Sequence, residues 1–414
     1  MKRRVVVTGM GAITPVGNDV ATTWRAITQG VSGGAPITKF DHSTFPIHFA
    51  CEVKGFDPLL YLERKEAKRA DLFAQYAIAA SVQAMDDAGF TDVSKYDPER
   101  LGVIIGSGIG GLKTFEEQHD VYRERGQSKI SAFFIPMFIS DIAAGLVSMR
   151  FNAKGPNYAT ISACATSAHA IGDAYRTIQY GDADMIITGG SEATVTPMAI
   201  GGFANMKALS ERNESPATAS RPFDATRDGF VMGEGGGIVI LEELEHARNR
   251  GAKIYAEIVG YGATGDAYHL TAPAPEGEGA QRAMRRAMLD AKLEPADIDY
   301  INAHGTSTPP GDLGETQAIK AVFGEQAYKI NVSSTKSMTG HMLGAAGAME
   351  FIFGALATRD SIVPPTINYE TPDPELDLNY TVNRAVKREV RAVLSNSFGF
   401  GGHNVSLAIK RYDE

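Results

Sequence analysis

The sequence has 414 residues, too many for one ordinary hydrophobic core, so we expect two domains or one domain enlarged by duplication. Hydrophobic residues make up 43% and charged residues 21%, a composition typical of a globular protein that excludes a disordered or fibrous chain. The net charge of −9 and the isoelectric point near 5.6 argue against a general nucleic-acid binder, because phosphate contacts need a basic face.

The chain begins with basic residues and a short apolar run. Lys2, Arg3 and Arg4 precede only three valines before Gly9, so we expect no signal peptide. Glycine or charged residues interrupt every apolar stretch before the roughly eighteen residues that a membrane helix needs, so no membrane insertion is expected. The two cysteines have neither metal-ligand spacing nor a disulfide framework, which favours a reducing, cytoplasmic location.

Apolar, β-branched segments alternate with long helical patterns, which predicts an α/β fold. The pattern restarts near residue 252, because a strand, a glycine-rich turn and a helix recur in the same order. The matching strands are expected at Arg4–Thr8, Leu101–Ile105 and Tyr158–Ser162, and again at Ile254–Val259, Ile298–Ala303 and Ile330–Ser333. We therefore predict a duplication with halves 1–252 and 253–414, whose equivalent turns surround one cleft.

A cluster of basic residues follows in the first half, with Glu66 as its only internal acid. It consists of Arg64, Lys65, Lys68 and Arg69. Two interpretations remain open at this point: an ordinary solvated helix face, or a docking patch for an acidic partner.

Cys164 lies where an apolar strand gives way to a small-residue turn and then to a helix that ends before Gly181. A helix N-terminus stabilises a thiolate, so we expect a lowered thiol pKa and a nucleophilic role. The alternative is a small buried packing residue. Cys51 lies in an alternating, strand-like stretch, and a packing role is expected for it.

Two of the nine histidines have a distinctive context. His304 follows an apolar strand and begins a stiff loop of small residues and prolines, after which Asp312 is expected to cap a helix together with Glu315. His341 precedes a helix whose first turns contain only small residues, in the half-repeat position that matches the Cys164 turn. His169 is expected to be structural. Surface positions are expected for His42, His48, His119, His246 and His269.

These motifs together resemble the β-ketoacyl-[acyl-carrier-protein] synthases, with the elongating synthase II type as the nearest form. The resemblance rests on Cys164 in its turn, on the His304 loop, on Lys336 through His341, and on the segment Asn396–Gly402. It extends from Val5 to Leu407 and implies a thiolase-like fold, which is a duplicated five-layer αβαβα architecture. It also implies decarboxylative condensation of a malonyl carrier protein with an acyl chain held as a thioester on Cys164.

The resemblance further implies roles for individual residues. The backbone N–H groups of Cys164 and Phe400 would hold the thioester oxyanion, and His304 and His341 would donate hydrogen bonds to the developing enolate. Lys336 would orient the site with Glu350 as its partner.

The resemblance also assigns the surroundings of the reacting groups. Thr306 and Thr308 would bind the pantetheine arm, and Phe400 would act as an acyl-pocket gate between the mobile glycines Gly399 and Gly401. Ile109 would shape the chain-length pocket. The docking face for the carrier protein would consist of Lys65, Lys68, Arg69 and Lys207. The expected partners are acyl and malonyl carrier proteins and a second copy of the chain, with no cofactor, metal or nucleic acid.

Several related classes remain to be separated. A thiolase needs a second, C-terminal cysteine, and no cysteine follows Cys164. Starter synthases of the third type and chalcone-type synthases carry Asn in place of His341, and a chain-length factor lacks the cysteine. A polyketide-type ketosynthase stays as the alternative function, and a binding module without chemistry stays open as well. His403, where many family members have Thr, is a departure close to the gate.

Overall fold

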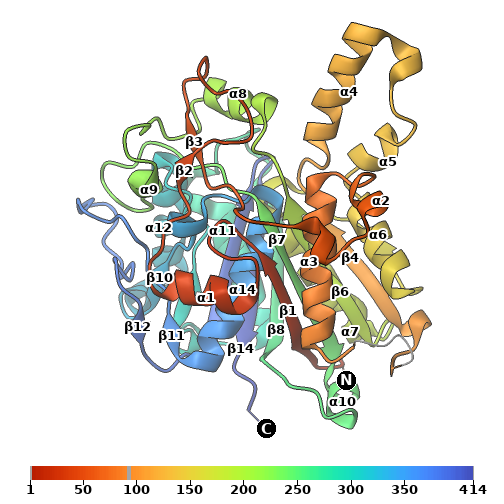
Figure 1. The fold of residues 1–414 in the computed structure, drawn as a ribbon. Coiled ribbons are helices and arrows are strands. Elements are labelled where there is room, and N and C mark those ends of the chain that lie inside the picture. Colours follow the sequence, from red (N-terminus) through yellow and green to blue (C-terminus); the bar gives the residue numbers. More distant parts are fainter. Residues whose placement is uncertain (1, 91–94, 414) are drawn as a thin grey trace.

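The computed structural model describes residues 2–90 and 95–413, and Figure 1 shows its fold. The main sheet has ten strands in the order β10-β9-β13-β14-β8-β1-β7-β6-β4-β5. The first half contributes β1 (Val5–Ile13), β4 (Leu101–Gly106), β5 (Asn157–Tyr158), β6 (Met185–Glu192) and β7 (Gly235–Glu243). The second half contributes β8 (Ala256–Gly265), β9 (Tyr300–Asn302), β10 (Asn331–Ser333), β13 (Ala392–Gly399) and β14 (His403–Lys410).

The strand order is symmetric about the junction between β1 and β8. On one side of the junction β1, β7, β6, β4 and β5 follow in order, and on the other side β8, β14, β13, β9 and β10 take the same places. The pairing directions agree as well, because β4–β6 and β9–β13 are parallel while β6–β7 and β13–β14 are antiparallel. The predicted duplication is therefore visible in the sheet itself.

Helices cover the sheet as three layers. Two small two-stranded sheets lie outside the main sheet. One pairs β2 (Ala35–Pro36) with β3 (Phe49–Ala50), and the other pairs β11 (Ile362–Val363) with β12 (Val386–Lys387). The first half supplies α1 (Val20–Thr28), α2 (Arg64–Ala67), α3 (Leu72–Asp87), α4 (Leu112–Arg125), α5 (Phe134–Phe138), α6 (Ile142–Phe151), α7 (Thr166–Tyr180), α8 (Pro197–Asn205), α9 (Pro216–Ala219) and α10 (Leu244–Asn249). The second half supplies α11 (Glu278–Ala291), α12 (Pro309–Phe323), α13 (Lys336–Thr339) and α14 (Ala346–Asp360).

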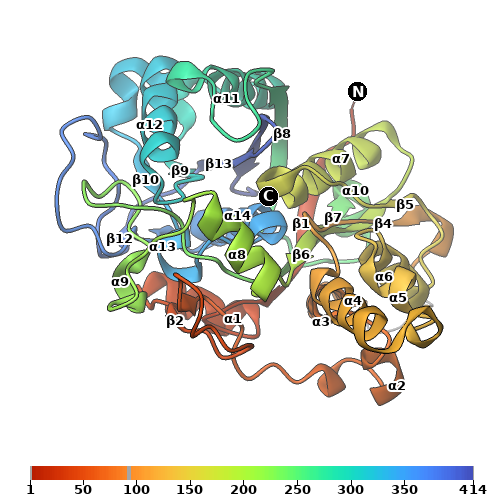
Figure 2. The same cartoon turned by 90° about the horizontal axis from the view of Figure 1, so that it is seen from above.

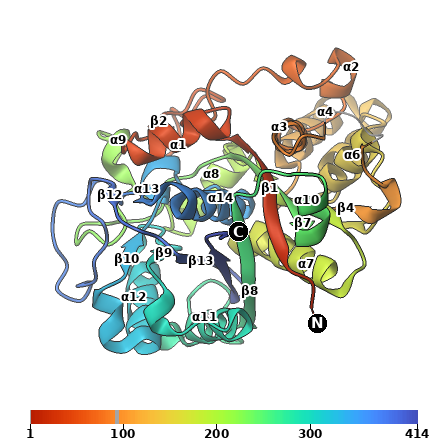
Figure 3. The same cartoon turned by 90° about the horizontal axis from the view of Figure 1, so that it is seen from below.

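The two central helices, α7 and α14, pack between the strands of both halves. Helices α3 and α6 cover the outer face of the first half, and α11 packs on the outer face of the second half beside α12. Figures 2 and 3 show these two outer groups on opposite sides of α14. The arrangement confirms the predicted five-layer αβαβα architecture.

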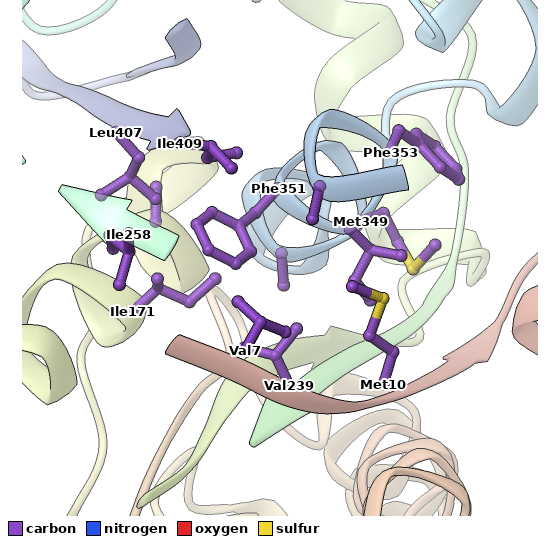
Figure 4. Close-up of a cluster of buried hydrophobic side chains, with 14 of the residues drawn as sticks. Val7, Met10, Ile171, Val239, Ile258, Met349, Phe351, Phe353, Leu407 and Ile409 are labelled. Carbon is purple, nitrogen blue, oxygen red and sulfur yellow. The ribbon is translucent and has the colours of Figure 1, made fainter. Parts of the chain in front are cut away.

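The largest buried cluster surrounds α14 (Figure 4). Phe351 and Met349 of this helix contact a shell that includes Val7 and Val239 from the first half and Leu407 from the second. All five side chains are at most 1% exposed. Because apolar burial contributes about 25 cal/mol per Å², this shared core holds the two halves together.

Glycines inside β1 and β8 allow two outer helices to pack directly on the strands. A Cβ at Gly11 would lie 1.9 Å from the carbonyl oxygen of Ala80 in α3, and one at Gly262 would lie 2.1 Å from that of Ala283 in α11. The expected glycine-rich turns after these strands are therefore wrong, because the strands continue through the glycines. The strand expected at Tyr158–Ser162 is also shorter, since β5 ends at Tyr158.

Within residues 2–90 and 95–413, no helix is long and apolar enough to span a membrane.

Candidate active site

Two equivalent turns, one from each half, carry Cys164 and His341. Each is a short 3₁₀ segment that leads into a central helix, Ala163–Ala165 into α7 and Leu343–Ala345 into α14. The first residue of each segment has a positive φ, 50° at Ala163 and 45° at Leu343. Gly344 is therefore the counterpart of Cys164, and His341 precedes it at the start of the same turn.

The Cys164 thiol is nearly buried, with 8% of the residue exposed. Burial raises the pKa of this thiol to about 12, although the charge of Lys336 and the backbone N–H groups of Phe400 and Cys164 lower it. The expectation of a lowered pKa is therefore wrong for the resting protein, because desolvation outweighs the donors at the helix start. The two N–H groups nevertheless converge on the sulfur.

The rings of His304 and His341 meet edge to face, with centroids 5.4 Å apart and an interplanar angle of 86°. Burial lowers the pKa of both rings well below the usual histidine value, and the charge of Lys336 adds to the effect. Both imidazoles are therefore neutral at pH 7. The Nδ1 atom of each ring is buried and has no hydrogen-bond partner among the described residues.

A buried ion pair lies behind the histidines. Lys336, at the start of α13, pairs with Glu350 of α14, and both side chains are at most 3% exposed. Burial raises the pKa of Glu350 to about 7, whereas its partner Lys336 lowers it. The two sequence-predicted residues are thus brought together, although fourteen positions separate them.

Glu315 and Asp312 hold the His304 loop from behind. The Glu315 carboxylate accepts hydrogen bonds from the backbone N–H groups of His304 (2.9 Å) and Gly305 (2.8 Å). Asp312 accepts from the N–H of Ser307 at 3.1 Å and does not cap a helix start, because α12 begins at Pro309 with Thr308 in the cap position. The capping prediction for Asp312 is wrong, since the two prolines start the helix earlier.

A cavity of about 320 Å³ connects most of the predicted site residues. Its lining includes Cys164, His304, His341, Thr306, Thr308, Gly399, Phe400 and Lys207. Lys336, Glu350, Gly401 and Ile109 lie outside the lining. The cavity also receives Phe230, whose ring meets the His341 ring edge-on at 5.3 Å.

The predicted gate lies at the tip of the β13–β14 hairpin. Gly401 and Gly402 have φ values of 85° and 75°, a region that other residues adopt only with strain, and Phe400 packs 6.5 Å from the Phe203 ring. Beside the gate, the hydroxyl groups of Thr306 and Thr308 lie 3.0 Å apart.

The predicted docking residues fall into two places. Lys65, Lys68 and Arg69 are exposed on and after α2, and the Arg69 guanidinium lies 4.3 Å from the centroid of the Phe133 ring. Lys207 follows α8 at the cavity entrance, with its side chain 78% exposed. Helices α2 and α8 lie apart in Figures 1, 2 and 3, so the four residues do not form one cluster within a single chain.

Two residues that hold or line the site were not recognised in this role from the sequence: Glu315 and Phe230. Glu315 was assigned to a helix cap, and its position eleven residues after His304 carries no signal for a long-range contact. The Cys51 prediction as a packing residue is confirmed, because it is 2% exposed within an apolar cluster.

Comparisons with known proteins identify the family of this chain. Residues 2–247 match the model of the beta-ketoacyl synthase N-terminal domain, and residues 255–370 match that of the C-terminal domain. The chain is 55% identical over 411 residues to a 3-oxoacyl-[acyl-carrier-protein] synthase 2 of Staphylococcus aureus (strain COL), with 99% of both sequences covered.

Solved structures with the same fold also cover the whole chain. A beta-ketoacyl synthase from Burkholderia phymatum STM815 has a TM-score of 0.93 at 36% identity, with 100% of both chains covered. A type II PKS ketosynthase, bound to the hexaketide and in complex with its acyl-carrier protein, has a TM-score of 0.92, 36% identity and the same coverage. Because the matches include both halves and nearly the full length, the chain belongs to the β-ketoacyl synthase family.

Proposed function

We propose that this chain is an elongating β-ketoacyl-[acyl-carrier-protein] synthase of type II, an acyltransferase that extends fatty acyl chains by a two-carbon unit. The observation that carries the proposal is one cavity lined by the Cys164 thiol and by two neutral histidines from the other half. A nucleophile and two hydrogen-bond donors at one point match the two stages of decarboxylative condensation. The relatives at 55% identity support the same activity.

The first stage is transfer of an acyl group to Cys164. The sulfur attacks the thioester carbonyl of an acyl carrier protein, and the backbone N–H groups of Cys164 and Phe400 stabilise the oxyanion. The carrier thiol leaves with the proton that the Cys164 thiol gives up. The charge of Lys336 assists, because it lowers the pKa of a thiol that burial has raised.

The second stage forms the new carbon–carbon bond. Malonyl carrier protein loses carbon dioxide, and His304 and His341 donate hydrogen bonds to the enolate oxygen that develops. The enolate carbon attacks the acyl-enzyme carbonyl, the bond to the Cys164 sulfur breaks, and the thiolate takes up one proton. A neutral imidazole keeps one N–H group, so each ring can still donate one hydrogen bond to the enolate oxygen.

The surrounding residues have supporting roles in this proposal. Lys336 and Glu350 orient the histidine side of the site, and Thr306 and Thr308 bind the pantetheine arm. Phe400 gates the acyl pocket on its glycine loop, formed with Gly399 and Gly401. Ile109 limits chain length from the apolar cluster that also contains Cys164.

The partner in this proposal is an acyl carrier protein in its acyl and malonyl forms. Carrier proteins of this kind are acidic, and Lys65, Lys68, Arg69 and Lys207 offer exposed positive charge to them. The ketosynthase solved in complex with its acyl-carrier protein supports this kind of partner.

A homodimer completes the proposed assembly, because separated basic patches of one chain can adjoin those of a second copy. Strand β5 is the edge of the main sheet, with Tyr158 42% and the nearby Ile161 62% exposed. Helix α4 also stands away from the body of the chain in Figure 1.

We further propose a cytoplasmic location. We also propose that the chain divides into halves 1–252 and 253–414 in the connection between α10 and β8.

Condensation by the purified chain tests the proposal. Acyl carrier proteins with primers of increasing length are offered together with malonyl carrier protein, and β-ketoacyl product is measured by mass spectrometry. Product from saturated fatty primers supports fatty acid elongation. The ketosynthase bound to a hexaketide, at 36% identity, keeps polyketide-type elongation as the second candidate. Product only from β-ketoacyl primers would favour it, and no product from any primer would contradict both.

A further inference from the structure

Glu192, the last residue of β6, is fully buried and is absent from the reaction described above. Its carboxylate accepts four hydrogen bonds. Oε1 accepts from the Ser107 hydroxyl (2.9 Å) and the Ile109 N–H (3.2 Å), and Oε2 accepts from the N–H groups of Gly108 (2.8 Å) and Gly344 (3.0 Å). A carboxylate has about four acceptor sites, so the donors match its full capacity.

These donors belong to different parts of the site and to different halves of the chain. Ser107 to Ile109 form the turn after β4 that carries Ile109, the proposed chain-length residue, and Gly344 is the second-half counterpart of Cys164. The two backbones are in close contact, because a Cβ at Gly344 would lie 2.4 Å from the Gly108 nitrogen. A Cβ at Gly108 would in turn lie 3.4 Å from the carbonyl oxygen of Ala163, next to Cys164.

The close contact creates an electrostatic requirement. The N–H groups of Gly108 and Gly344 point at one oxygen atom, so their positive ends repel each other unless an acceptor lies between them. A glutamine at position 192 would offer one carbonyl oxygen, and in either orientation its NH₂ group would face at least one backbone N–H donor. Buried donors without an acceptor are costly, so the turns would separate.

The His341 turn and the Ser107 to Ile109 turn differ in how many other hydrogen bonds hold them in place. His341 is held independently, since its N–H donates to Val231 (2.7 Å) and its carbonyl accepts from Gly233 (2.9 Å). The Ser107 to Ile109 turn has weaker support: Gly110 donates to the Ser107 hydroxyl within the turn itself at 3.0 Å. Loss of the carboxylate would therefore displace Ile109 more than His341.

We propose that Glu192 is a positioning residue that fixes the Ile109 turn against the Cys164 and His341 turns and thereby sets acyl-chain selectivity. This inference rests on the proposed function, because selectivity is expressed through the acyl-enzyme at Cys164. Its physical content is separate: the carboxylate holds the Ile109 turn, which packs against the apolar cluster that contains Cys164, at a fixed distance from the reacting groups.

The test compares Glu192→Gln with Glu242→Gln in the full-length chain. Glu242 is a matched control, because it is also fully buried on a strand but bonds Arg250, His246 and Thr8 away from the cavity lining. In Glu192→Gln, the ratio of kcat/KM for long over short acyl primers should change by about tenfold, the scale of one or two misplaced methylene contacts. Malonyl decarboxylation should stay within about twofold of the parent, and Glu192→Asp should restore part of the ratio.

A parallel loss of condensation and decarboxylation, or an unchanged primer ratio, would overturn the proposal. If Glu192→Gln does not fold, Ser107→Ala removes one donor and leaves the carboxylate, and an unchanged primer ratio in that variant would count against the proposal equally. Hydrogen–deuterium exchange separates this failure from failure of the proposed function. Faster exchange at residues 107–110 than at 340–342 in Glu192→Gln supports the positioning role even if the parent chain makes no condensation product, and equal exchange overturns it.

Discussion

His304 and His341 meet edge to face at a centroid distance of 5.4 Å, although they come from two different turns of the second half. Their neutral rings face the cavity that also receives the Cys164 turn of the first half. The proposed chemistry depends on the side chains of Cys164, His304 and His341 together. Replacing each one separately tests its role.

Replacement of Cys164 by Ala should abolish the acyl-enzyme, because no other thiol lines the described cavity. Intact-mass measurement after incubation with acyl carrier protein checks this. Cys51→Ala is the matched control: Cys51 is the other buried cysteine, and the adduct should persist in that variant. An acyl adduct of normal yield on Cys164→Ala would contradict the assigned nucleophile.

Replacement of either histidine by Ala should separate the two stages. Acyl transfer to Cys164 should remain measurable, whereas malonyl decarboxylation should fall by about 10² to 10³ per lost donor. Release of carbon dioxide from labelled malonyl carrier protein gives the rate. His119→Ala, at an exposed side chain on α4, should release carbon dioxide as fast as the parent. An unchanged rate in both His304→Ala and His341→Ala would refute their roles.

The histidines should differ in their response to pH. Burial lowers the pKa of His304 and His341, whereas the hydrogen bond that the His246 ring donates to Glu242 raises the pKa of His246. NMR of histidine-labelled protein at about pH 6.5 should therefore show two neutral rings and a protonated His246. Below about pH 6.5 these two histidines are protonated in the unfolded chain but stay neutral in the folded protein. The free energy of unfolding should therefore decrease as the pH falls below about 6.5. Half-protonated rings of His304 and His341 at that pH would contradict the expectation.

Removal of one partner from the Lys336–Glu350 pair should be costly. Lys336→Met leaves a buried carboxylate without its cation and should destabilise the fold by about 3 to 5 kcal/mol. The double variant Lys336→Met/Glu350→Gln should recover most of that loss, since neither charge remains. Urea denaturation measures both. Equal losses in the single and double variants would show that packing, and not the pairing of charges, accounts for the cost.

The glycine contacts between strand and helix should be sensitive to one added methyl group. Gly11→Ala would place a Cβ 1.9 Å from the Ala80 carbonyl oxygen and should destabilise by at least about 1 to 3 kcal/mol. Gly145→Ala in α6 is the control, because nothing lies within 4 Å of its added Cβ. It should stabilise the helix by about 0.5 to 1 kcal/mol. Thermal unfolding checks the pair, and two effects of the same sign would contradict the argument.

The sequence by itself determined the order of the elements and much of the site. The alternation of apolar runs with helical patterns predicted the α/β class. Its restart near residue 252 predicted the duplicated sheet, whose strand order is symmetric about the junction between β1 and β8. The spacing of turns predicted that Cys164 and His341 lie in equivalent segments. Period and turn chemistry are local properties, so they can be recognised without knowledge of distant contacts.

Only the tertiary structure decided the electrostatics and the long-range contacts. Burial raised the pKa of Cys164 against the helix-start prediction, and it kept His304 and His341 neutral. The turn expected after Thr8 does not form, because Gly9 and Gly11 lie within β1. These positions lack a side chain because α3 packs directly on the strand there, a contact that the sequence does not reveal. Desolvation depends on every group packed around an atom, and a sequence pattern records only the neighbours along the chain.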